Sequence, residues 1–147
     1  MVQTAAKLLP SYEGNVTPKQ AWQELESDPR AQLVDVRTHA EWTYSGTPEL
    51  GGINKRTRTI SWQFYPNFEA NPNFLTELAH VAPDKSAPLY FLCKRGGRSS
   101  KAALAATEAG WLHCYNIDGG FEGEADPKGR RGTLNGWKAD ALPWNQA

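Results

Sequence analysis

Short apolar segments alternate with helix-forming segments along this chain of 147 residues, and that alternation limits the folds open to it. Residues 31–37 (AQLVDVR), 89–93 (LYFLC) and 113–117 (HCYNI) are short and rich in aliphatic, β-branched or aromatic side chains, which is typical of buried strands. Strands that alternate with helices pair in parallel, because each helix carries the chain back across the sheet. The sequence therefore predicts an α/β fold with a mainly parallel sheet and helices on both faces.

Four segments have the start and stop signals of helices. Thr17 and Pro18 suit the cap and first position of a helix that ends at residues 27–29. Thr38 can cap a short helix through Trp42. A third helix follows residues 71–72, and a fourth covers the Ala-rich stretch 99–109. The third should place three apolar side chains on one face, namely Phe74, Leu75 and Leu78. A weaker strand with exposed basic residues is expected within 55–62 (KRTRTISW).

Composition narrows the class of protein. Lys plus Arg and Asp plus Glu each number 16, so a formal net charge of zero argues against a nucleic-acid binder. Two cysteines cannot form a disulfide framework, and no segment reaches the roughly 20 apolar residues of a membrane span. We expect a soluble, cytoplasmic chain with a single domain over residues 1–147. Its core should cover about 16–144, with a loose arm at 1–13 and a polar insertion at 122–136.

The segment 93–99 (CKRGGRS) concentrates the chemistry of the chain. A predicted strand ends at a cysteine, and four residues separate that cysteine from an arginine at the start of a helix. The two glycines allow a tight curl that points backbone N–H groups at one position, while three cations and the helix N-terminus add positive charge. Such a cradle would hold a thiolate or a charged substrate and make the cysteine a nucleophile. The predicted site residues are Cys93 as nucleophile and Lys94, Arg95, Gly96, Gly97, Arg98 and Ser99 as the loop.

Three motifs resemble those of the single-domain rhodanese-like sulfurtransferases. Their active loop, Cys-x-x-x-x-Arg, matches Cys93 to Arg98. Their Asp-x-Arg at a strand end, with a following Glu, matches residues 35–37 and Glu41. The remaining matches are the turn Gly119-Gly120, the pair Gly136-Trp137 and the pair Leu142-Pro143. The resemblance covers roughly residues 16–144 and implies a five-stranded rhodanese-like sheet with Asp35 and Arg37 in supporting positions.

Two segments depart from the pattern of that family. Residues 46–54 (GTPELGGIN) stand where the family usually has His-x-Pro-Gly-Ala, and the polar stretch 122–135 is longer than in minimal members. In the family, both segments often border the opening of the active site. They therefore affect the choice of sulfur acceptor more than the sulfur-transfer chemistry.

The resemblance implies an enzyme, a thiosulfate sulfurtransferase. Cys93 would take a sulfane sulfur from a donor such as thiosulfate and hold it as a persulfide. A nucleophilic acceptor, which could be cyanide, a thiol or a protein cysteine, would then remove it. We expect neither a metal nor an organic cofactor. The expected partners are a small sulfur-containing anion and a thiol or protein acceptor, with no nucleic acid and no membrane.

Other functions stay open at this stage. One is a non-catalytic rhodanese-like module that binds a protein, although such modules commonly lack the cysteine. Another is a persulfide carrier that serves a protein acceptor. Cys-dependent phosphatases also have a Cys-to-Arg loop, but theirs typically holds five intervening residues and often a His before the cysteine, where this chain has Leu92.

Several residues, most of them outside the loop, have two interpretations. Cys114 fits a buried structural thiol, with a resolving cysteine as the alternative. Trp62, Phe64 and Tyr65 fit core packing or one wall of the pocket. The basic clusters at 55–58 and 128–131 fit solvated charge or a docking surface for an acidic protein. Cys93 itself could be a buried structural cysteine with solvated basic neighbours.

Overall fold

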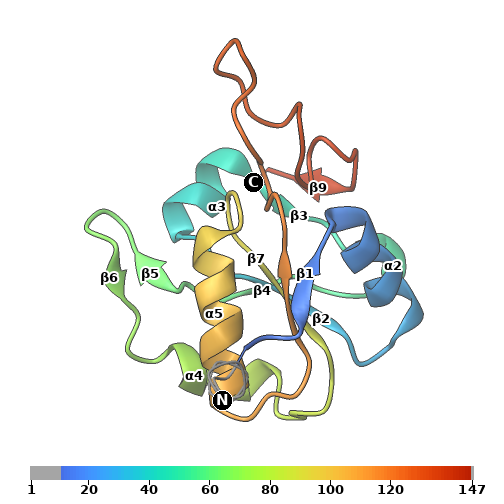
Figure 1. Cartoon of the computed structure of the whole chain (residues 1–147), viewed down its shortest axis with the longest axis vertical. Helices are drawn as coiled ribbons and strands as arrows, with labels where there is room; N and C mark the ends of the chain where they lie inside the picture. The colour runs from blue at the N-terminus through green and yellow to red at the C-terminus, as the bar shows by residue number, and fades with distance from the viewer. Residues whose placement is uncertain (1–10, 147) are drawn as a thin grey trace, which may run out of the picture.

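The predicted alternation of strands and helices is present in the computed structural model, which describes residues 11–146 (Figure 1). The main sheet contains β1 (Gly14–Val16), β2 (Gln32–Asp35), β4 (Arg58–Thr59), β7 (Leu89–Leu92) and β8 (Cys114–Ile117). Its order is β1-β8-β7-β2-β4, and every neighbouring pair is parallel. The predicted fold class, with five strands, is confirmed.

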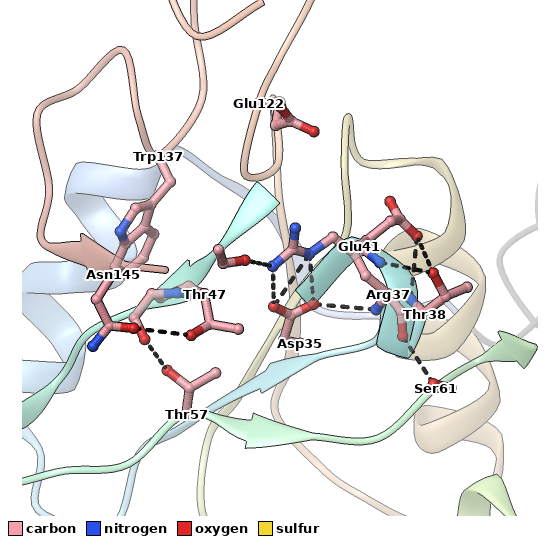
Figure 2. Close-up of polar contacts among 12 residues, drawn as sticks. Asp35, Arg37, Thr38, Glu41, Thr47, Thr57, Ser61, Glu122, Trp137 and Asn145 are labelled. Atoms are coloured by element: carbon pink, nitrogen blue, oxygen red, sulfur yellow. Dashed lines mark hydrogen bonds and ion pairs between the residues drawn. The ribbon is translucent and has the colours of Figure 1, made fainter. Parts of the chain in front are cut away.

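All four predicted helices form, and two of them begin at the predicted caps Thr17 and Thr38. The fourth begins at Gly97, two residues earlier than predicted. The helices are α2 (Pro18–Ser27), α3 (His39–Ser45), α4 (Phe74–Val81), α5 (Gly97–Glu108) and the 3-10 turn η1 (Gly51–Ile53). Thr17 and Thr38 each cap a helix, and in both cases the backbone N–H of the cap residue donates to the side chain of the third helical residue. Figure 2 shows this reciprocal contact between Thr38 and Glu41. No helix within residues 11–146 is both long and apolar enough to cross a membrane.

The two faces of the sheet bury different sets of side chains, because successive strand residues point to opposite faces. On β7, Leu89 and Phe91 pack with the apolar faces of α4 and α5, and Cys93, just past the strand, shares that cluster. The alternate residues Tyr90 and Leu92 pack with α2 and with Trp137. Helices therefore cover both faces, as predicted, and the parity of β7 directs Cys93 toward α5.

Two small antiparallel pairs lie outside the main sheet. β3 (Thr47–Pro48) pairs with β9 (Trp144–Asn145), and β5 (Gln63–Phe64) pairs with β6 (Glu69–Ala70). The first pair fixes the last described residues to the segment after α3. The second is a hairpin whose residues 64–70 are exposed.

The structure differs from the sequence prediction within the main sheet and in α4. β1 was not predicted, because its three residues form an edge strand that depends on pairing with β8. The strand expected within 55–62 is reduced to two residues, which pair only with β2. Leu75 is 39% exposed, whereas its predicted companions Phe74 and Leu78 are buried. The predicted arm at residues 1–13 lies outside the described residues as far as residue 10.

The turn after β8 packs directly beneath the residues that follow β7. Gly120 adopts a φ of 61°, in the left-handed region that favours glycine. A Cβ on Gly120 would lie 2.5 Å from the carbonyl oxygen of Cys93 and 2.6 Å from that of Lys94. The N–H of Phe121 donates to the same Cys93 carbonyl at 2.8 Å. The turn thus supports the start of the predicted active loop and leaves no space for a side chain.

Gly120→Ala should reduce the free energy of unfolding by about 2–5 kcal/mol, because it adds a backbone clash to the cost of a left-handed conformation. Gly129→Ala is the matched control, since Gly129 has a φ of 79° but nothing within 4 Å of its added Cβ. That control should lose only about 1–2 kcal/mol. Urea denaturation of both variants measures the difference, and equal losses would contradict the packing argument.

Candidate active site

Cys93 lies at the carboxyl edge of the sheet, where ligands bind in open parallel sheets. It follows the last residue of β7, and residues 94–96 connect it to α5. This connection lies beside α3 in Figure 1. The sulfur is thus held between a buried strand and the positive end of a helix of 12 residues.

The loop closes around the sulfur of Cys93. The backbone N–H of Gly96 donates to Sγ at 3.1 Å, and the hydroxyl of Ser99 lies 3.2 Å from Sγ. Gly96 has a φ of 117°, which aims its N–H inward at little conformational cost. Only 1% of the surface of Cys93 is exposed. The arrangement supplies one fixed donor, the Gly96 N–H, and one hydroxyl in contact with the sulfur, and it covers that sulfur from solvent.

A buried polar chain continues from Ser99. Its hydroxyl donates to the side-chain oxygen of Asn116, and the Asn116 amide donates to Asn15 at 3.0 Å. Asn116 lies on β8 opposite Phe91, on the face that packs against α5. Ser99 carries one hydroxyl proton, so it cannot donate to Asn116 and to a thiolate at the same time. Asn116 therefore competes with Sγ for that proton.

Arg98 ties the loop to α3. Its two terminal nitrogens donate to the two carboxylate oxygens of Glu41 at 2.6 and 2.8 Å. Burial opposes the ionisation of Glu41, but the charge and hydrogen bonds of Arg98, with those of Thr38, lower its pKa to about 2. Burial opposes the charge of Arg98 as well, and Glu41 outweighs it, so the pKa of Arg98 is raised. Because the fork of Arg98 is used on Glu41, Arg98 positions the loop.

A cavity of about 340 Å³ opens beside this ion pair. Lys94 and Arg98 line one side of it, and Tyr44, Tyr65 and Phe68 line another. The three aromatic side chains are 51–80% exposed. Of the residues considered for a pocket wall, Tyr65 lines this cavity, and Phe64 lines the adjoining one. Trp62 instead packs edge-on against Phe74, with ring centroids 5.1 Å apart.

Asp35 and Arg37 form a fully buried ion pair in the face of the sheet that packs against α2. Figure 2 shows Arg37 donating to both carboxylate oxygens of Asp35. Arg37 also donates to the carbonyl of Gly46 at 2.7 Å. The guanidinium also lies 4.3 Å from the ring centroid of Phe121. These contacts join β2 to the residues after α3. They place the pair in the scaffold, on the opposite face from the sulfur.

Cys114 lies at the far end of the strand next to β7. It is in register with Leu89, four residues before Cys93, which corresponds to roughly 13 Å along parallel strands. A disulfide requires Cα atoms within about 7 Å. Burial raises the pKa of the Cys114 thiol to about 11. These facts support the interpretation of Cys114 as a structural thiol.

The structure brings together some of the predicted residues and separates others. Gly96 and Ser99 contact the sulfur of Cys93, Lys94 lines the adjacent cavity, and Arg95 is exposed. Gly97 is the first residue of α5. Asn116 is not among the predicted site residues, although a lone amide in an otherwise apolar strand is a signal of a buried polar contact.

Residues 13–147 match the protein family described as the STR4 middle domain. An uncharacterized protein of Rickettsia conorii is 41% identical over 131 residues, which is 88% of this chain and 95% of that protein. Rhodanese-like domain-containing protein 4 of Arabidopsis thaliana is 30% identical over 136 residues, 92% of this chain and 26% of that protein. Thiosulfate sulfurtransferase GlpE of Actinobacillus pleuropneumoniae is 27% identical over 108 residues, 74% of this chain and 82% of that protein.

A solved structure gives the same result for the fold. The crystal structure of Rv0390 from M. tuberculosis superposes with a TM-score of 0.85 and 44% sequence identity, covering 93% of this chain and all of that one. The resemblance inferred from the three sequence motifs is confirmed. The chain belongs to the STR4 middle-domain family and is a rhodanese-like domain.

Proposed function

We propose that this protein is a thiosulfate-type sulfurtransferase that carries sulfane sulfur as a persulfide on Cys93. The observation that carries the proposal is the closure of the loop on this sulfur, with the Gly96 N–H at 3.1 Å and the Ser99 hydroxyl at 3.2 Å. The Gly96 N–H is fixed at that range and stabilises a negative sulfur without reorganisation. The Ser99 hydroxyl adds a second donor when its proton turns from Asn116 to Sγ. The family membership supports a sulfurtransferase-type domain, and the likeness to a thiosulfate sulfurtransferase supports the donor class.

The proposed reaction has two steps and needs no oxidant. In the first, the Cys93 thiolate attacks the outer sulfur of thiosulfate, a sulfur–sulfur bond forms to Cys93, and sulfite leaves with the electron pair of the broken bond. In the second, an acceptor thiolate or cyanide attacks the outer sulfur of the persulfide, and the Cys93 thiolate is the leaving group. Negative charge is on Cys93 before and after each cycle, so the same loop donors serve both steps.

The charges around the loop have separate tasks in this proposal. Lys94 faces the cavity and would meet the sulfonate oxygens of the donor, with Arg95 nearby on the surface. Arg98 is held by Glu41 and keeps the loop curled. Because Cys93 is 1% exposed and is not among the residues that line the cavity, the donor would reach Sγ only after the loop opens toward the cavity. Binding of the anion would supply the energy for that opening.

A persulfide carrier that delivers sulfur to another protein is a second candidate. Tyr44, Tyr65 and Phe68 are exposed beside the loop, and such apolar surface is typical of contact sites. Phosphatase activity is less compatible with this chain, because only four residues separate Cys93 from Arg98. A non-catalytic binding module would not need donors fixed on a thiol.

Thiosulfate treatment should add one sulfur atom to the protein, as read by intact mass spectrometry, and cyanide should remove it. Cys93→Ala should not gain that mass, whereas Cys114→Ala, in which a buried thiol with a raised pKa is removed, should gain it like the native chain. Mass gain in Cys93→Ala, or none in the native protein, would rule out the persulfide on Cys93.

The competition for the Ser99 proton predicts opposite effects in two variants. Asn116→Leu removes the competing acceptor, so the hydroxyl donates to the thiolate and alkylation of Cys93 by iodoacetamide at neutral pH should be about threefold to tenfold faster. Ser99→Ala removes the donor and should slow alkylation by a similar factor. Loss of packing alone would move both rates in the same direction, so a common direction contradicts the hydrogen-bond argument.

Glu41→Gln tests the clamp on Arg98. The pKa of Glu41, about 2, lies below its ordinary 4.5, so the ionised pair stabilises the fold fully above pH 4.5 and loses that effect as pH falls toward 2. At neutral pH the variant should lose about 1–2 kcal/mol of unfolding free energy, as expected for a partly screened ion pair with hydrogen bonds, and its turnover should fall.

The loss in Glu41→Gln should shrink when urea denaturation is repeated below about pH 4. Glu108→Gln is the control, because Glu108 is an exposed residue of α5 and should show little effect at either pH. A loss in Glu41→Gln that is the same at both pH values would place the effect in packing rather than in the charge.

A further inference from the structure

A second cavity, of about 600 Å³, lies at the opposite edge of the sheet from Cys93. Its walls come from the segments that lead into β2, β4 and β7. Because these strands are parallel, their first residues share one edge of the sheet, and Cys93, after the last residue of β7, belongs to the other (Figure 1). A ligand in this cavity would not contact the catalytic loop.

Cations dominate the lining of this cavity. Four basic side chains line it, and one carboxylate accompanies them: Arg30, Lys55, Arg56, Arg58 and Asp84. The whole chain has a formal net charge of zero, so this excess is local. The rest of the lining includes apolar atoms of Ala31, Pro83 and Ala87. The cavity therefore combines a positive rim with an apolar surface.

These basic side chains have more hydrogen-bond donors than the acceptors they contact. Arg58 donates to Gln32 through Nε only, so neither of its terminal nitrogens has a hydrogen-bond partner among residues 11–146. Arg56 is exposed and has no side-chain hydrogen bond within the same described range. The ammonium of Lys55 donates two of its three protons to the backbone carbonyls of Asp28 and Ala31.

Arg30 is the member of the group that is already paired. It lies 3.7 Å from Asp84 and 3.9 Å from Asp28, and its side chain is 55% exposed. Lys55 is less well compensated, since burial lowers its pKa and Asp28 only partly offsets that effect. An anion between Lys55 and Arg58 would supply the missing acceptors and the missing charge.

The geometry points to a binding site for a small molecule that carries an oligophosphate group. A phosphate chain offers several anionic oxygens in a row, which suits two guanidinium forks and an ammonium arranged along one cavity. A single carboxylate or sulfate carries fewer oxygens and less charge, and would leave part of these donors without an acceptor. The site is separate from the proposed sulfur transfer and does not depend on it.

Isothermal titration with inorganic tripolyphosphate at low ionic strength tests the site. We expect saturable binding of one ligand per chain. Arg58→Gln should weaken binding by about tenfold to a hundredfold, the range for lost charge-assisted hydrogen bonds. Arg58→Lys keeps the charge but lacks the planar guanidinium, so its affinity should lie between those of the native chain and Arg58→Gln. Because Arg58 also contacts Gln32, the exposed Arg56→Gln is a second variant that leaves the fold intact.

Two control variants separate this site from general attraction of anions. Lys101→Gln removes an exposed cation of α5, and Arg95→Gln removes one from the catalytic loop. Neither variant should alter the affinity for tripolyphosphate. A nucleoside diphosphate that binds more tightly than tripolyphosphate would show that the apolar surface of the cavity holds an organic group. No saturable binding, unchanged affinity in Arg56→Gln and Arg58→Gln, or loss in Arg95→Gln would each overturn the proposal.

Discussion

The pairing of β7 between β2 and β8 is the constraint on which the site depends. All four residues of β7 are buried, and both neighbours run parallel to it. A strand held on two sides cannot shift its register without exposing apolar side chains. It therefore delivers Cys93 to one edge of the sheet and toward α5, while the ion pair of Asp35 and Arg37 occupies the other face. Strand parity therefore places the Cys93 sulfur and the Asp35–Arg37 ion pair on opposite faces of the sheet.

Near donors dominate over distant charges at this sulfur. A hydrogen bond to a charged group contributes about 1.5–3 kcal/mol, whereas exposed ion pairs contribute about 0–1 kcal/mol. The Gly96 N–H is in the first class, and the Ser99 hydroxyl joins it when its proton points to Sγ. Arg95 is an exposed charge and has a correspondingly weak effect. Arg98, although cationic, is largely neutralised by Glu41. In the proposed mechanism, the basic character of the loop would attract and orient a donor anion, and the hydrogen-bond donors near Sγ would set the reactivity of the thiolate.

Local signals in the sequence predicted most of the architecture, because caps, apolar runs and glycine turns act over a few residues. Thr17 and Thr38 mark helix starts that the structure contains. What could not be read locally depends on partners far along the chain. Glu41 stands 57 positions from Arg98, and Asn116 stands 17 from Ser99. The edge strand β1 depends on β8 in the same way, and only the folded register brings these pairs together.

The hairpin of β5 and β6 pairs only with itself within the part of the chain described by the structure, yet it supplies Tyr65 and Phe68 to the cavity beside the loop. Such a peripheral element can change in length or sequence at little energetic cost to the sheet. Under the proposed function, recognition of the acceptor and transfer of the sulfur would therefore be encoded in separable parts of the polypeptide. Descendants of this fold could then diversify their acceptors by remodelling the hairpin while the thiol chemistry stays unchanged.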